Sequence, residues 1–154
     1  MKTKNILLST LMSAVFFMAS QSAIAAPVTS FTKVESQQTF TETTAAIQTA
    51  TSRHQMMVMG KIDQGKVLSM TGLDLKGTSF LIGNPEMAKK VFSMNPAAGA
   101  VLPLRLYVWN QNNKTWIGWF NPAEQLGMIS PKLVMPGQML EKKIMNIATQ
   151  AATK

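Results

Sequence analysis

A chain of 154 residues with no cysteine and one histidine lacks the side chains for several common chemistries. The absence of cysteine excludes disulfides, thiolate metal sites and iron–sulfur clusters. One histidine cannot supply a zinc site of the usual multi-histidine kind. The formal net charge is +8, but the lysines are scattered and form no basic stripe, which argues against nucleic-acid binding.

The first 25 residues predict a Sec-type signal peptide. A positively charged start precedes an apolar run over residues 6–18, and Ala23 and Ala25 supply the small residues of a cleavage site. The run is too short and too interrupted by polar residues to span a membrane. We expect cleavage after Ala25, which leaves a mature chain of residues 26–154 in the periplasm or outside the cell, with no integral membrane segment. Two lysines leave with the leader, so the net charge falls to +6.

The mature chain reads as one domain in which strands and helices alternate. Period-two alternation predicts strands at 31–35, 54–63, 78–82, 104–109 and 115–120. Helical spacing predicts helices at 41–51, 86–94 and from 136 onward, with a short helix or turn at 64–72. In the second strand we expect Val58 and Ile62 to share one face. This order favours an α+β fold with an antiparallel-rich sheet and helices packed on one face.

An ordered set of short motifs resembles a known bacterial family. The motifs are Ile62-Asp63, Gly72-Leu73-Asp74-Leu75, Thr78, Leu81-Ile82-Gly83-Asn84-Pro85, Asn95-Pro96, Leu102-Pro103-Leu104, Val108-Trp109, Trp116-Ile117-Gly118 and Asn121-Pro122. In this order and spacing they are similar to the family called domain of unknown function 302. The resemblance implies a TATA-binding-protein-like α+β fold, often dimeric, and no catalytic residues. This chain differs from the family pattern at two places. Many members carry histidines where this chain has Gln64 and the stretch around Gln125.

Methionine is unusually frequent, with ten of the thirteen in the mature chain. His54, Met56, Met57 and Met59 form the densest group and are candidate ligands for the soft cations Cu(I) or Ag(I). Alternation along a strand would, however, place His54 and Met56 on one face and Met57 and Met59 on the other. The favoured interpretation is that methionine fills an adaptable core. The alternative is a set of exposed thioethers that buffer oxidants, with Met57, Met59 and Met128 as candidates.

A second group of candidate residues is aromatic. Arg105, Tyr107 and Trp109 alternate along the strand at 104–109, and Trp116 stands on its hairpin partner. Such a patch rarely faces water in a monomer, so it predicts either a buried core or a dimer interface. The alternative is a binding surface for a small apolar or anionic molecule, with Arg105 as the charged anchor.

Taken together, these patterns favour a non-catalytic exported domain over an enzyme, and a hydrolase built on His54 is the least supported interpretation. We expect a homodimer formed through the sheet or hairpin, and a binding role toward a small ligand or an envelope partner. No cofactor is expected apart from the Cu(I) or Ag(I) considered above. The alternative function is a methionine-rich envelope stress protein that buffers oxidants or these metals.

Overall fold

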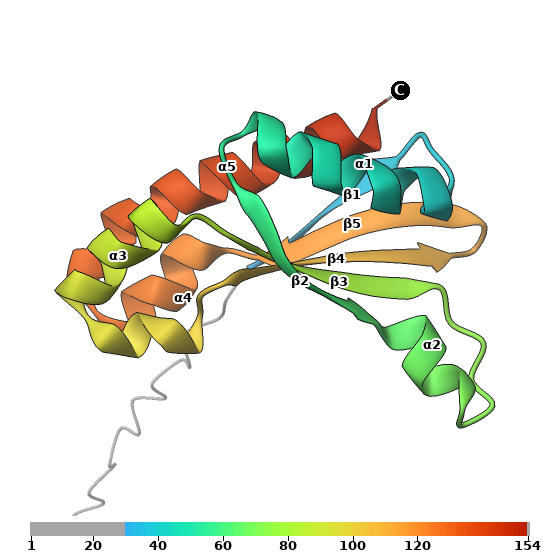
Figure 1. The fold of residues 1–154 in the computed structure, drawn as a ribbon, viewed down its shortest axis with the longest axis horizontal. Helices are drawn as coiled ribbons and strands as arrows, with labels where there is room; N and C mark the ends of the chain where they lie inside the picture. Colours follow the sequence, from blue (N-terminus) through green and yellow to red (C-terminus); the bar gives the residue numbers. More distant parts are fainter. Residues whose placement is uncertain (1–29, 154) are drawn as a thin grey trace, which may run out of the picture.

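The computed structural model describes residues 30–153, so the predicted signal peptide lies outside the described residues. The strands are β1 (Phe31–Ser36), β2 (Met57–Asp63), β3 (Gly77–Gly83), β4 (Leu104–Gln111) and β5 (Lys114–Phe120). The α-helices are α1 (Phe40–Arg53), α2 (Gln64–Ser69), α3 (Pro85–Met94), α4 (Pro122–Ile129) and α5 (Val134–Ala152), and two short 3-10 helices are η1 (Pro96–Ala100) and η2 (Pro131–Leu133) (Figure 1).

The five strands form one sheet in the order β1-β5-β4-β3-β2, with every neighbouring pair antiparallel. The hairpin between β4 and β5 turns at Asn112 and Asn113, which have φ angles of 53° and 61°. Asparagine tolerates this left-handed conformation, and two such residues in a row are typical of a tight hairpin turn. The predicted α+β fold and antiparallel sheet are therefore confirmed.

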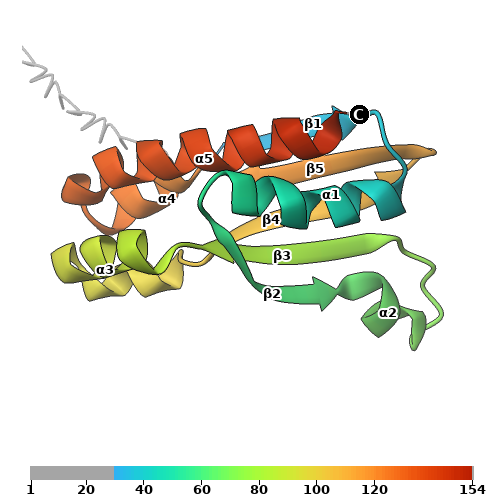
Figure 2. The same ribbon diagram turned by 45° about the horizontal axis from the view of Figure 1, so that its top comes forward.

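The core lies between one face of the sheet and the two helices α1 and α5, which run side by side across it (Figure 2). Alternation along β4 buries Leu104, Leu106 and Val108 on this face, as predicted. Ile144 and Ile147 of α5 pack into the same core. Burying each of these aliphatic side chains stabilises the fold by about 1.5–3 kcal/mol, so these two helices fix the covered face and leave the other face of the sheet open.

Helix α4 was missed by the sequence analysis, although its start carries a clear signal. Asn121 caps the helix by accepting the backbone N–H groups of Ala123 and Glu124, and Pro122 occupies the first helical position. A polar cap, a proline and an early acidic residue are typical of a helix start. No helix was predicted between the strand at 115–120 and the helix that starts at 136.

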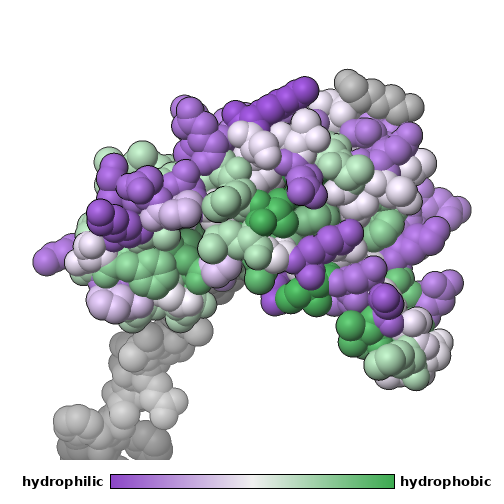
Figure 3. Space-filling model, in the orientation of Figure 1, coloured by the Kyte–Doolittle hydropathy of each residue, from purple (hydrophilic) through white to green (hydrophobic). Residues whose placement is uncertain are grey.

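The side chains of β2 do not lie on the faces of the sheet that the sequence predicted. The register against β3 shifts between Val58 and Gly60, so Met59 forms a bulge. Val58 pairs with Ile82 on the covered face, whereas Ile62 pairs with Ser79 on the open face. The two side chains therefore do not share a face. An apolar surface with partly exposed side chains follows β2 and α2 (Figure 3).

The C-terminal end of α5 lies beside the segment that follows β1. The Gln37 backbone N–H donates to the carbonyl of Ala152 at 2.8 Å, and Gln38 Nε2 donates to the carbonyl of Ala151 at 2.9 Å. These bonds satisfy carbonyls of the last turn of α5 that have no partner within the helix. Within residues 30–153, no helix has the length and apolar character needed to cross a membrane.

Candidate ligand-binding cleft

The open face of the sheet carries the predicted aromatic side chains in a row. The rings of Tyr107 and Trp109 are stacked with centroids 5.4 Å apart and an interplanar angle of 9°. Trp116 continues the row, 6.4 Å from Trp109, and Lys33 Nζ lies 4.4 Å from its ring centroid. The ring of Phe31, on β1, packs beside that of Trp109, with ring centroids 6.2 Å apart. We call Phe31, Tyr107, Trp109 and Trp116 the aromatic row.

The sheet divides at one end of this row. Pairing between β4 and β5 begins at the hairpin turn and stops at the Tyr107–Gly118 pair. Beyond that pair, β5 continues along β1 as far as Phe120, whereas β4 continues along β3 back to Leu104. The two central strands therefore separate inside the sheet, and we call this separation the fork.

Local sequence explains why the strands part. Pro103 precedes β4 and has no backbone N–H to extend a ladder. At the end of β5, the Trp119 indole donates to Glu141 of α5 at 3.2 Å. The backbone N–H of Asn121 donates to the carbonyl of Ser30 at 2.9 Å. The end of β5 is thereby held toward α5 and β1, and not toward β4.

A cleft of about 620 Å³ opens at the fork. Its apolar walls include Phe31, Leu81 and Phe120, and its polar lining is formed by Gln64, Ser79, Arg105, Tyr107 and Gln125. Ile144 of α5, a core residue, also lines the cleft, so the cleft reaches through the fork to the helix on the covered face. A volume of this size lies within the range of small-molecule sites, roughly 300–1,000 Å³.

Gln64 is the most unusual polar group in the cleft. It begins α2 directly after Asp63, whose side chain caps that helix by accepting the Lys66 N–H at 2.9 Å. Gln64 Nε2 donates to Ser79 Oγ at 2.7 Å, while Gln64 Oε1 is buried and has no hydrogen-bond partner among the described residues. In either orientation of the amide, one of its two polar atoms lacks a partner. A buried amide atom without a partner costs about 1–3 kcal/mol.

Tyr107 and Arg105 of β4 add a phenol and a guanidinium to the polar lining of the cleft. The Tyr107 hydroxyl lies against Gly77, where a side chain would collide with it. Burial raises the pKa of Tyr107 above its ordinary value, so the phenol stays neutral and can both donate and accept. Arg105 is exposed on the same face and places a cation at the cleft.

The predicted ligand-binding residues are divided by the fork. Arg105 and Tyr107 line the cleft, whereas Trp109 and Trp116 lie farther along the open face. Gln64, Ser79 and Gln125 were not predicted as site residues. No local pattern marks them, because the fork brings together β3, the start of α2 and α4. Gln64 and Gln125 are nevertheless the two places where the family resemblance implied histidines, and both line this cleft.

The structure brings only two of the four predicted metal ligands to one cavity. His54 ends α1, and its carbonyl accepts Lys143 Nζ at 2.9 Å. Met56 and Met59 line a second, apolar cavity of about 140 Å³ together with Met87, whereas His54 and Met57 do not. Among residues 30–153, no three histidine or acidic side chains form a group that could hold a metal ion.

The interpretation of methionine as core filling is wrong for most of these residues. Met56 is buried and Met87 is half-buried, but the other eight methionines of the mature chain are exposed. The three methionines named as exposed candidates, Met57, Met59 and Met128, are each about half exposed. The core is instead built almost entirely of aliphatic and aromatic side chains.

The fold and the cleft define an α+β domain with one open sheet face and a ligand-sized opening between its central strands. Residues 32–151 match the model of the family described as domain of unknown function DUF302, and the chain belongs to that family. A solved structure described as the uncharacterized conserved protein DUF302 from Bacillus stearothermophilus is similar in fold, with a TM-score of 0.75 and 23% sequence identity. The similarity covers 79% of this chain and 97% of that one. No curated protein matches the chain.

Proposed function

We propose that this domain is a non-catalytic binding module that holds a small molecule bearing an anionic group in the cleft at the fork. The observation that carries the proposal is the convergence of polar side chains, with Arg105 among them, on a cleft of about 620 Å³. Export to the periplasm or beyond the cell is part of the proposal and is supported by the signal-peptide pattern of residues 1–25.

The lining of the cleft indicates what the ligand must offer. Arg105 favours a carboxylate or phosphate, which its planar guanidinium can bind through two hydrogen bonds. The Gln64 amide, which also lines the cleft, favours a ligand that carries a hydrogen-bonding group such as a hydroxyl or amine. The rings of Phe31 and Phe120 favour an apolar frame between these groups. A small apolar acid with a second polar group satisfies all three features.

The same lining supports binding over acid–base catalysis. The cleft is lined by neutral amides, a serine, a neutral phenol and one arginine, and none of its lining residues is acidic or a histidine. Ser79 is fully buried and already accepts from Gln64, so it is not available as an activated nucleophile.

Calorimetric titration with benzoate, an apolar carboxylate, tests the proposal. We expect Arg105→Ala to weaken binding about tenfold, which corresponds to ~1.4 kcal/mol. Arg53→Ala is the matched control, because Arg53 is the other arginine of the mature chain and lies exposed at the end of α1. Binding that is unchanged in Arg105→Ala, or weakened equally in both variants, would contradict the proposal.

Native mass spectrometry of the protein purified from the cell envelope is a second test of ligand binding. We expect a bound mass that leaves on denaturation, and its loss in Arg105→Ala but not in Arg53→Ala. A molecule retained equally by both variants would place the binding site elsewhere.

A further inference from the structure

The methionines that follow the signal peptide lie mainly on the surface. Eight of the ten are between 45% and 84% exposed: Met57, Met59, Met70, Met94, Met128, Met135, Met139 and Met145. Methionine is normally among the side chains most often buried. None of the eight lines the cleft at the fork, so this feature is independent of the proposed ligand site.

These exposed side chains contribute little to the stability of the core. The buried cluster contains a single methionine, Met56, and is otherwise aliphatic and aromatic. Conversion of a thioether to a sulfoxide makes an apolar side chain polar and disrupts a core that depends on it. On this surface the same conversion exposes the added oxygen to water and leaves the packed residues unchanged.

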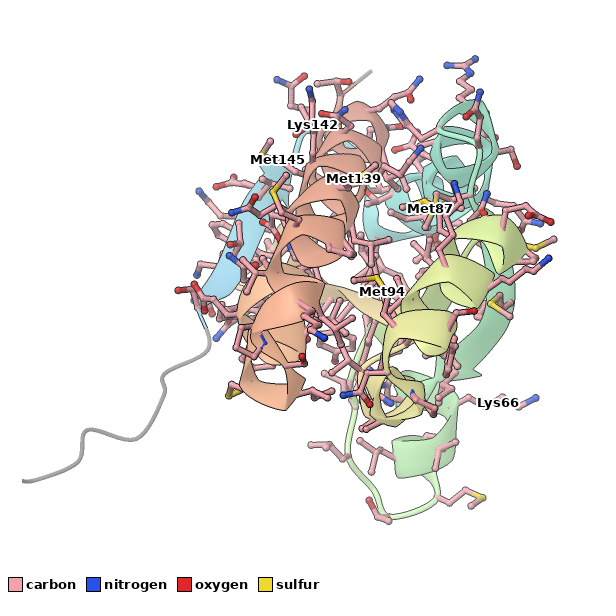
Figure 4. The ribbon with its side chains drawn as sticks, turned by 90° about the vertical axis from the view of Figure 1, so that its left-hand side faces the viewer. Lys66, Met87, Met94, Met139, Lys142 and Met145 are labelled. Carbon is pink, nitrogen blue, oxygen red and sulfur yellow. The ribbon has the colours of Figure 1, made fainter. Side chains whose placement is uncertain are left out.

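Two of the exposed methionines flank a lysine on α5 at helical spacing (Figure 4). Met139 and Met145 project from α5 on either side of Lys142 in the sequence, and Met94 lies on α3 in the same view (Figure 4). Lys142 is exposed, as is Lys89 on α3. A positive surface raises the local concentration of small anions, hypochlorite among them. Because the chain has no cysteine, methionine sulfur is its most readily oxidised atom.

We infer that the exposed methionines are a sacrificial sink for two-electron oxidants of the hypochlorous acid class. The sulfur lone pair attacks the chlorine of HOCl and hydroxide leaves. Water then adds to the sulfur, and chloride and protons are released. Sulfur loses two electrons, chlorine gains two, and each side chain consumes one HOCl to give one sulfoxide. Methionine sulfoxide reductases can restore the thioether.

Titration of the purified protein with HOCl, followed by mass spectrometry and circular dichroism, tests the inference. We expect one oxygen atom per equivalent until about eight are bound, matching the exposed methionines. Peptide mapping should find Met56 unmodified at that point, and the thermal unfolding midpoint should be unchanged. Oxidation of Met56 in step with the others, or unfolding after the first equivalents, would overturn the inference.

Two variants separate a sink from incidental damage. Changing Met135, Met139 and Met145 together to Gln, which favours helix, should lower the capacity by three equivalents. Met56→Leu is the matched control and should leave the capacity unchanged, because that side chain is shielded. The native protein should also protect an oxidant-sensitive enzyme in the same solution better than a variant with all eight exposed methionines changed to Gln. Equal protection by the two would overturn the inference.

Discussion

A single side-chain pair, Gln64 and Ser79, links the fold to the cleft. Ser79 is completely buried on the open face of β3, and its hydroxyl accepts from Gln64 at 2.7 Å. Gln64 therefore both satisfies a buried serine and presents an unpartnered atom beside the cleft. Its geometry resembles that of a group held ready for a ligand, since a purely structural amide would normally have both polar atoms paired.

This pair predicts a strongly non-additive double-mutant cycle. Gln64→Leu leaves the buried Ser79 hydroxyl without its partner, a loss of about 1–3 kcal/mol that is offset by the similar gain from removing the unpartnered Oε1. Adding Ser79→Ala should recover most of that loss, since removing both polar groups is nearly neutral. Urea unfolding of the two single variants and the double variant measures the coupling. Strictly additive free energies would show that the hydrogen bond is not formed in solution.

Glu141 makes the stability of the fold depend on pH in an uncommon direction. Burial raises the pKa of Glu141, the hydrogen bond from the Trp119 indole opposes that rise, and the neighbouring Glu124 adds to it. The folded state therefore holds this proton more tightly than the unfolded state. Its contribution to stability is greatest in acid and falls as the pH rises from the ordinary glutamate pKa through the raised one.

We accordingly expect Glu141→Gln to be more stable than the native protein at neutral pH. The amide oxygen can still accept from Trp119, while the cost of a partly buried charge disappears. The difference in unfolding free energy between the two proteins should shrink as the pH is lowered through the window above. A difference that stays constant across mildly acidic pH would contradict the raised pKa. The carboxylates that do not interact with Glu141 are common to both proteins and cancel in the comparison.

At the level of elements, the close approach of α4 and α5 depends on one glycine. A Cβ at Gly137 would overlap the Cα of Ala123 and lie 2.9 Å from the carbonyl oxygen of Pro122. Both of these are backbone atoms at the start of α4, so neither can move without shifting that helix. Since α4 follows directly from β5, any such shift would also reach the fork.

Gly137→Ala should therefore destabilise the protein even though alanine favours helix. The gain in helix propensity is at most about 1 kcal/mol, and overpacking typically costs about 1–3 kcal/mol. Asn146→Ala, on the exposed side of α5, is the control and should change stability by less than about 0.5 kcal/mol. Chemical denaturation compares the stabilities of the two variants. A Gly137→Ala variant at least as stable as the native protein would contradict the prediction, because it would show that α4 can shift at little cost.

Regular elements were predictable from the sequence wherever periodicity was clear. The alternation of β4 correctly assigned its buried face, and α5 was predicted from its apolar stripe. The side-chain orientation along β2 was not predicted, because the bulge at Met59 inserts one residue. Gly60, next to the bulge, is the one local signal, since an isolated glycine within a strand pattern suggests a bulge. The fork could not be predicted from the sequence either. It arises because β5 continues its pairing along β1 while β4 continues along β3.

Across the whole molecule, composition revealed the excess of methionine but not its location. Hydrophobicity alone places methionine inside, and the core at this length could have contained all ten. The structure fills that space with smaller branched side chains and alanines along α1 and α5. The predicted aromatic surface, in contrast, does lie together on one face, because Tyr107, Trp109 and Trp116 follow simple strand alternation.

We also expect the protein to form a homodimer through the hairpin end of the aromatic row. Trp109 and Trp116 remain partly exposed there, away from the cleft, and aromatic surface of this kind favours association. Sedimentation velocity should give the mass of two chains for the native protein and of one chain for Trp116→Glu. Thr49→Glu on α1 is the control for added charge and should remain dimeric. A native protein that sediments as one chain would contradict the prediction.

The order in which the strands pair has a consequence for biosynthesis. β1, the earliest strand, is joined to β5, the latest, and the last turn of α5 binds the segment that follows β1. A ribosome-bound chain consequently cannot close its sheet until nearly all of it has been made. Because the sheet closes late, the newly made polypeptide stays unfolded during its synthesis. A Sec translocon transports unfolded chains, so this late closure suits the proposed export.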